Sequence, residues 1–160
     1  MTDSKPDWLP NLLKLMPWKS NTYEILYKLF QIDFIKSRPI YRGKKISIPL
    51  EKEDDKEKLF WHLVSKEEKE SGERLPDLCR SERLLWTKPA IEHVDEPEII
   101  DWDDEDNKKR IITYVWLKEY DFIVIMKKLK NEKRLLLTAY CIEYNHTRRY
   151  FERKYRNRII

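Results

Sequence analysis

The sequence predicts an α+β domain, in which N-terminal helices pack on a curved, mainly antiparallel sheet of four to five strands and a helix closes the C-terminus. Three observations predict this class. Apolar residues recur at helical spacing in the first half of the chain, β-rich runs with hairpin-sized gaps follow, and a basic helical segment comes last. The 160 residues fit one domain, with residues 1–20 wrapping onto a core formed by 21–160.

The N-terminal half is divided by its turn residues. Residues 1–20 carry three prolines and are expected to wrap onto the body, with a short helix between turns. Asn21 and Glu24 form a capping signal for a helix that continues to about residue 37, where Arg38-Pro39 ends it. The remaining elements are a strand at 41–48, a helix at 55–66, a charged loop at 66–73, a short helix at 76–83 and an extended segment at 84–94, interrupted by Pro89.

The C-terminal half has a stronger β pattern. Three β-rich runs, at 110–117, 121–128 and 133–143, are separated by gaps short enough for hairpins, which predicts an antiparallel meander. A basic, aromatic-studded helix is expected from Asn145 to about Asn157.

Composition excludes several classes of protein. The chain is 41% hydrophobic and 39% charged, which is typical of a soluble globular protein. Only two glycines occur, so a glycine-rich phosphate loop is excluded. No apolar run is long enough to cross a membrane and no signal peptide is recognised at residues 1–10, so the expected compartment is the cytoplasm. Cys79 and Cys141 are expected to be small buried residues rather than zinc ligands or a disulfide.

Charge is segregated along the chain. Residues 127–158 hold eleven Lys or Arg against three Glu, which is typical of a surface that meets a polyanion. Residues 95–106 hold eight acidic side chains and no base, as a solvated loop, a decoy for the basic surface or a metal site would. The spacing of Asp101, Asp103 and Glu105 is similar to the start of a calcium loop, but the sixth and twelfth positions do not fit, so no metal is expected.

The segment from Leu135 to Tyr140 is an apolar strand that carries two polar side chains, Thr138 and Tyr140. Because side chains alternate across a strand, these two are expected to share a face with Leu136. On an open face their hydroxyls can hold a phosphate, whereas on a closed face they are core residues with satisfied hydroxyls. The strand alone leaves both interpretations open.

Two other groups of residues have the chemistry of a functional site. His62 lies on an apolar helix face, where it is either a packed residue or a proton-transfer group that works near neutral pH. The segment 80–89 interleaves cations with Trp86, an arrangement suited to phosphate contact and base stacking, or equally to a solvated helix followed by an edge strand. Its cations are Arg80, Arg83 and Lys88.

A series of short motifs runs through most of the chain. They are Tyr23-Glu24, Asp33-Phe34-Ile35, Phe60-Trp61-His62-Leu63-Val64-Ser65, Glu73-Arg74-Leu75-Pro76-Asp77-Leu78, Glu82-Arg83-Leu84-Leu85-Trp86, Pro89-Ala90-Ile91-Glu92, Tyr114-Val115-Trp116-Leu117, Asp121-Phe122-Ile123-Val124 and Leu136-Leu137-Thr138-Ala139-Tyr140. In this order and spacing, from about residue 20 to 155, the chain resembles the phage-associated branch of the barnase/EndoU/colicin D/RelE-like nuclease superfamily.

The resemblance implies a metal-independent RNA endonuclease of the kind met in mobile elements and toxin systems, with N-terminal helices on a four-stranded antiparallel sheet. The family's helix histidine falls on His62 and its Thr-x-Tyr strand on Thr138 and Tyr140. Its cationic positions fall on Arg83 and Lys88, with Arg80 as the third choice. Where many relatives continue with a short apolar segment, this chain has Cys141-Ile142-Glu143, which places an acid close to the strand.

The functional hypothesis is therefore cleavage of RNA by the adjacent 2′-hydroxyl, which gives a cyclic phosphate without a cofactor or metal. The expected partners are single-stranded or tRNA-like RNA and an acidic inhibitor protein, with no membrane. The alternative is a catalytically inactive module of a mobile element that binds RNA or protein through the basic surface. Residues expected to bind RNA are Arg80, Trp86, Lys127, Arg148 and Arg149.

Overall fold

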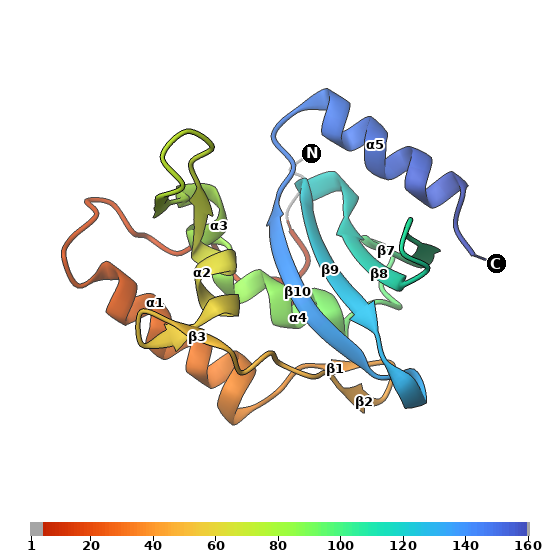
Figure 1. Cartoon of the computed structure of the whole chain (residues 1–160), viewed down its shortest axis with the longest axis horizontal. Coiled ribbons are helices and arrows are strands. Elements are labelled where there is room, and N and C mark those ends of the chain that lie inside the picture. Colours follow the sequence, from red (N-terminus) through yellow and green to blue (C-terminus); the bar gives the residue numbers. More distant parts are fainter. Residues whose placement is uncertain (1–4, 160) are drawn as a thin grey trace.

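A computed structural model describes residues 5–159 and confirms the α+β class (Figure 1). Its centre is a four-stranded antiparallel meander with the strand order β10-β9-β8-β7, so β10 and β7 are the edges. The strands are β7 (Ile99–Glu105), β8 (Ile111–Leu117), β9 (Phe122–Lys128) and β10 (Arg134–Cys141). Single 3₁₀ turns at Lys118–Tyr120 and Lys130–Glu132 join the last three strands, and α5 (Asn145–Arg156) follows.

Helices and short hairpins make up the N-terminal half. The predicted first helix is present as α1 (Thr22–Phe30) with a π-helical continuation, η1 (Gln31–Lys36). The other helices are α2 (Lys58–Val64), α3 (Leu78–Glu82), the 3₁₀ turn η2 (Leu84–Trp86) and α4 (Thr87–Glu92). The hairpins pair β1 (Ile40–Tyr41) with β2 (Lys44–Lys45), β3 (Lys52–Glu53) with β4 (Lys56–Glu57), and β5 (Ser65–Glu67) with β6 (Arg74–Pro76).

Two predicted elements are interrupted by tight turns. The predicted strand at 41–48 is wrong, because Arg42 and Gly43 adopt positive φ values of 46° and 84° and fold the chain into the β1–β2 hairpin. The predicted helix at 55–66 is shortened to α2, which begins at Lys58. Asp54 and Asp55 have positive φ and form the turn between β3 and β4, so the helix cannot begin there. The predicted loop at 66–73 is partly paired, since residues 65–67 and 74–76 form a hairpin.

Two segments have a different secondary structure from the one predicted. The segment 84–94 is helical rather than extended. Pro89 is the third residue of α4, within the first helical turn, where a backbone N–H has no intrahelical acceptor and proline is tolerated. The acidic segment 95–106 is mostly the edge strand β7 rather than a loop, since Ile99 and Trp102 are buried against the sheet's two sides.

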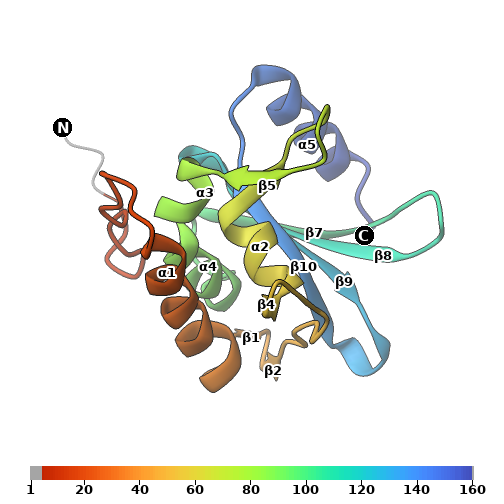
Figure 2. The same cartoon turned by 60° about the vertical axis from the view of Figure 1, so that its left-hand side comes forward.

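The sheet is covered on both faces. One face packs against α2 and α4 in the main core, with α1 packed on α2 and η2, and the other face packs against α5, as the views in Figures 1 and 2 show. The α5 face is mostly aromatic, with Trp102 stacked on Tyr114 and Phe151 of α5 lying across Tyr114 and Trp116. This arrangement buries both sides of β8, whose residues from Ile112 to Leu117 are all buried.

A β-bulge changes the side-chain alternation in β10. The register with β9 shifts between Leu136 and Thr138, so that Leu137 is the extra residue. Leu136 therefore joins the main core, whereas Leu137 and Tyr140 pack on the α5 side. The prediction that Leu136 shares a face with Thr138 and Tyr140 is wrong for this reason, although Thr138 and Tyr140 do share one.

Carboxylates of β7 are held by arginines from distant segments. The buried Arg134 donates from Nε to the Thr113 hydroxyl (2.6 Å) and from Nη2 to Asp103 Oδ2 (3.2 Å), and Thr113 in turn donates to Asp103 (2.6 Å). Asp101 accepts from the Tyr41 hydroxyl (2.6 Å) and from Arg42. These contacts pair two of the four carboxylates of β7 with arginines. No cluster of three or more metal-ligating side chains occurs within residues 5–159.

Replacing Asp103 with alanine is expected to lower the free energy of unfolding by about 2–4 kcal/mol. The reason is that Arg134, only 7% exposed, keeps its charge but loses its counter-ion. Urea unfolding measures the change. As a control, Glu51→Gln breaks the exposed Lys58–Glu51 pair and should have little effect. Equal destabilisation by both variants would contradict a structural role for the Asp103–Arg134 pair.

The helices within residues 5–159 are too short or too polar to cross a bilayer.

Candidate functional site

A cavity of about 800 Å³ opens beside the edge strand β10, between α2, the β5–β6 hairpin and α3. His62, Arg80 and the pair Thr138 and Tyr140, which come from three separate segments of the sequence, all line it. The structure therefore brings together three of the five residues for which the sequence predicts catalysis and one for which it predicts RNA binding. The other lining residues are Lys66, Glu67, Glu68, Lys69, Arg74 and Leu137.

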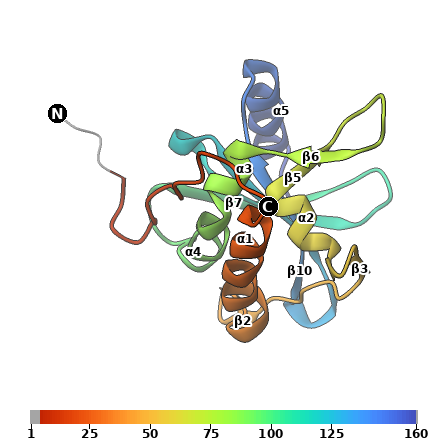
Figure 3. The same ribbon diagram turned by 90° about the vertical axis from the view of Figure 1, so that its left-hand side faces the viewer.

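The cavity exists because two helices lie against the edge of the sheet. In Figure 2, α2 runs in front of β10, and α3 follows after the β5–β6 hairpin. The apolar side of α2 points into the main core and leaves His62 on the side that faces the hairpin. Figure 3 shows that hairpin projecting away from the body, where it forms one wall of the cavity.

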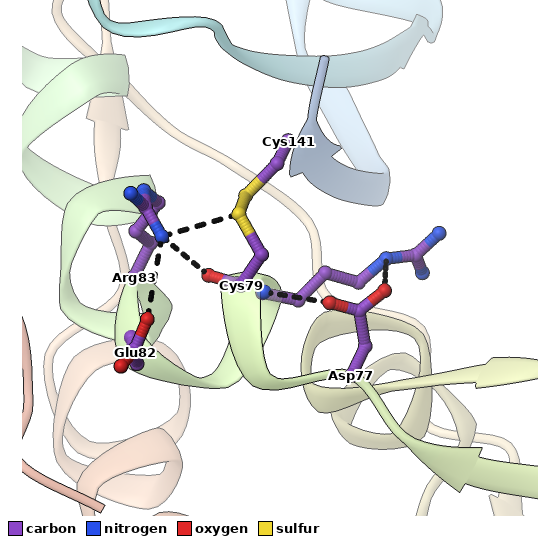
Figure 4. Close-up of a disulfide and its surroundings, with 6 residues drawn as sticks. Asp77, Cys79, Glu82, Arg83 and Cys141 are labelled. Atoms are coloured by element: carbon purple, nitrogen blue, oxygen red, sulfur yellow. Dashed lines mark hydrogen bonds and ion pairs between the residues drawn. A yellow bond between two sulfur atoms is a disulfide. The ribbon is translucent and has the colours of Figure 1, made fainter. Parts of the chain in front are cut away.

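A disulfide between Cys79 and Cys141 ties α3 to the end of β10 (Figure 4). The prediction that these cysteines are unpaired buried residues is wrong, because the meander returns β10 to the N-terminal end of α3 and no sequence spacing reports that approach. Cys79 directly precedes Arg80 and Cys141 directly follows Tyr140. The cross-link thus joins the two elements that supply a guanidinium and a phenol to the cavity.

His62 is held by Arg74 from the neighbouring hairpin. Arg74 Nη2 lies 3.3 Å from His62 Nδ1, and Arg74 Nε donates to the buried Ser65 hydroxyl at 3.1 Å. Because a guanidinium can only donate, Nδ1 accepts, which assigns the proton of the neutral ring to Nε2. Partial desolvation, and then the charges of Arg74 and Arg80, lower the pKa of His62 below its usual 6.5. The neutral form of the imidazole is therefore favoured at pH 7.

Arg80 and Tyr140 form the opposite wall. Arg80 Nη1 donates to the backbone carbonyls of His62 (2.8 Å) and Ser65 (3.1 Å), which anchors α3 to the end of α2. Its guanidinium carbon lies 5.3 Å from the centre of the Tyr140 ring. Burial, followed by the nearby Tyr150, raises the pKa of Tyr140, while Arg80 partly opposes the shift. Tyr140 therefore keeps its proton and can donate a hydrogen bond.

Arg83, Lys88 and Trp86 do not line the cavity. The Arg83 guanidinium donates to the Cys79 carbonyl (3.1 Å) and lies near Glu82 (Figure 4). It also covers the Trp86 ring. Lys88 donates to the backbone and hydroxyl oxygens of Ser37. Trp86 is 5% exposed and its indole N–H is bonded to the Pro10 carbonyl, so it is not available for base stacking. These positions differ from the prediction because 84–94 is a helix rather than a sheet strand.

The remaining residues expected to bind RNA lie away from the cavity. Arg148 on α5 is paired with Asp121 and donates to the Lys118 carbonyl, so it holds the start of α5 against the sheet. Arg149, the next residue, is exposed. Lys127 lies in β9, half-buried and between its pairing partners Ile112 and Leu135.

Three cations of the cavity come from a segment to which the sequence assigns no role. Lys66 and Lys69 lie within the stretch 66–73 expected to be a charged loop, and Arg74 directly follows it in the β5–β6 hairpin. The signal that could have found them is Ser71-Gly72, because Gly72 has a φ of +70° and closes the hairpin that returns Arg74 to His62.

We expect the imidazole of His62 to titrate below pH 6.5, and Arg74→Gln to raise its pKa by removing a nearby positive charge. In the wild-type protein the lowered pKa means that folded His62 binds a proton less readily than unfolded His62. The free energy of unfolding of the wild-type protein should therefore fall as the pH drops below about 6.5. NMR titration of the ring proton measures the pKa. Lys36→Gln, at the end of η1, is the matched control, and an unchanged midpoint in Arg74→Gln would contradict the contact.

The cavity combines an imidazole, two guanidiniums, two lysines, a hydroxyl and a phenol with the carboxylates of Glu67 and Glu68. Guanidiniums and hydroxyl donors bind phosphate oxygens, and a neutral imidazole can accept a proton. The arrangement can therefore bind a phosphate ester and remove a proton from a neighbouring hydroxyl. Comparisons of the chain with protein-family models, curated proteins and solved structures found no match.

Proposed function

We propose that this protein is a metal-independent endoribonuclease that cleaves RNA by attack of the 2′-hydroxyl on the adjacent phosphorus and leaves a cyclic phosphate. The observation that carries the proposal is the meeting of His62, Thr138 and Tyr140 with Arg74 and Arg80 in one cavity. The resemblance to phage-associated and toxin-type nucleases supports the same reaction.

His62 is the general base in this proposal. The reaction must remove the proton of the 2′-hydroxyl as its oxygen bonds to phosphorus, and the lowered pKa of His62 keeps a large fraction of the ring neutral at pH 7 and able to take that proton. As the bond from phosphorus to the 5′-oxygen breaks, the leaving oxygen takes a proton from water. Nδ1 becomes available when the guanidinium of Arg74 turns from the ring to the charged oxygens of the phosphate. Arg74 thus couples phosphate binding to release of the base.

The other side chains stabilise the charge that develops on the phosphate. Arg74 and Arg80 bring two fixed positive charges to the cavity, and Thr138 supplies a hydroxyl donor. The raised pKa of Tyr140 favours hydrogen bonding to a phosphate oxygen over transfer of its proton. Of the three cations predicted from the segment 80–89, Arg80 takes the role of binding the phosphate. Arg83 and Lys88 do not line the cavity, whereas Arg80 does.

The experiment incubates the purified protein with single-stranded RNA in excess EDTA. The expected result is cleavage that gives 2′,3′-cyclic phosphate ends, and no cleavage where the 2′-hydroxyl of the scissile nucleotide is replaced by hydrogen. Cleavage that stops in EDTA would contradict the metal-independent reaction. RNA binding with no cleavage by the wild-type chain would favour the inactive binding module.

The proposed partners are RNA and, as in toxin systems, an acidic protein that inhibits the enzyme by covering the cavity. The cations that line the cavity, Lys66, Lys69, Arg74 and Arg80, are the charges that such a protein would neutralise.

A further inference from the structure

The exposed side of α5 is a row of arginines. Side chains at positions 146, 149, 150, 153 and 156 are all exposed, and this spacing of three or four residues places them on one face of the helix. Phe151 lies on the opposite face and is buried against the sheet. The exposed face therefore presents Arg149, Arg153 and Arg156 with the ring of Tyr150 between them.

The cations of α5 divide into two groups. Those toward the sheet are paired, Arg148 with Asp121 and Lys154 with Asp104 (3.3 Å). Arg149, Arg153 and Arg156 form no ion pair within the part of the chain that the structure describes. Arg153 approaches the Tyr150 ring at 6.0 Å and lines a surface pocket with Asp104 and Glu105, without an ion pair to either. The acidic residues that neutralise the sheet side thus leave three guanidiniums free on the outer side.

The row begins close to the catalytic cavity. Tyr150 is near enough to Tyr140 to raise its pKa, and Phe151 packs against the Tyr140 ring with 6.4 Å between ring centres. Figures 1 and 2 show α5 crossing the end of β10 and continuing away from α2. A strand of nucleic acid that leaves the cavity past Tyr140 can therefore continue along the outer face of α5.

We propose that Arg149, Arg153 and Arg156, together with Tyr150, bind the phosphate backbone of the RNA strand next to the scissile phosphate. The path of the RNA from the cavity to α5 rests on the proposed function. The binding surface on α5 is itself separate from the catalytic cavity. Helix geometry spaces the three arginines about 6 Å and 4.5 Å apart along the axis, a regular array that suits a chain of repeating charges. Tyr150, 43% exposed, adds a ring on which a base can stack.

The test measures binding of a single-stranded RNA of about 15 nucleotides to the full chain carrying His62→Ala, so that the RNA stays intact. Adding Arg149→Gln, Arg153→Gln and Arg156→Gln should weaken binding by about 10- to 100-fold at 0.1 M salt. The slope of log K against log salt should become shallower by about 2, since three contacts each contribute about 0.7. The matched control replaces Lys14, Lys19 and Lys36 with Gln, which removes the same charge from exposed positions far from α5.

Different outcomes separate the alternatives. Unchanged affinity and slope in the arginine variant, with circular dichroism that shows a folded protein, would overturn the proposal. So would an equal loss of affinity in the lysine control, because net charge alone would then explain the effect. An arginine variant that still binds RNA but no longer binds poly-glutamate would assign the row to an acidic protein instead. If the wild-type chain binds RNA through this row but does not cleave it, the proposed function fails and the binding surface stands.

Discussion

His62→Ala is expected to lower the rate of RNA cleavage by about 10²- to 10⁴-fold, the range typical of a positioned general base. The ring accepts a hydrogen bond from Arg74, and its lowered pKa favours the neutral form that can accept a proton at neutral pH. The measurement is single-turnover cleavage at saturating enzyme, which reports the chemical step separately from RNA binding. Binding of the same RNA should change little, because the imidazole carries no charge at pH 7.

Two further variants test whether the loss is specific. His146→Ala removes an exposed histidine that stacks on Tyr144 outside the cavity, so cleavage should keep its wild-type rate. Thr138→Val keeps the shape of the side chain but removes the hydroxyl, and a reduction of about 10²- to 10³-fold is expected from the loss of one donor to the phosphate. Cleavage that survives both His62→Ala and Thr138→Val would remove the cavity as the catalytic site.

Local sequence signals predict the elements whose contacts are local. The strands β8, β9 and β10 and the helix α5 follow from runs of β-formers, short gaps and a cationic helical segment. Thr138 and Tyr140 share a face because alternation is a property of the strand itself. Leu136 departs from that face because the bulge depends on how β10 pairs with β9, which a single strand does not encode.

Errors in the predicted site come from contacts between distant segments. Arg83 and Lys88 were expected near a sheet strand, but the segment is helical because Thr87, Ala90 and Ile91 are buried on one side of it. Arg74 is absent from the predicted site because only the fold of the hairpin brings it to His62. The acidic sequence of β7 has the composition of a loop, because the arginines that pair with its carboxylates, Arg42 and Arg134, lie elsewhere in the sequence.

Reduction of the disulfide between Cys79 and Cys141 is expected to lower the free energy of unfolding by about 2–4 kcal/mol. The two residues are 62 positions apart, so the cross-link closes a long loop and restricts the unfolded chain strongly. For a chain of this size, that change corresponds to a fall in Tm of about 5–15 °C. Thermal unfolding with and without a thiol reductant measures it.

The disulfide should also affect the cavity, because it joins the two elements that carry Arg80 and Tyr140. Reduction frees α3 to move relative to β10, so cleavage should weaken at temperatures well below the reduced protein's Tm. The variant Cys79→Ala/Cys141→Ala should behave like the reduced protein and should not respond to reductant, which separates loss of the cross-link from other effects of the thiol. An identical Tm in oxidised and reduced wild-type protein, with alkylation showing two free thiols only after reduction, would show that packing of α2 and α3 against β10 holds the cavity together without the cross-link.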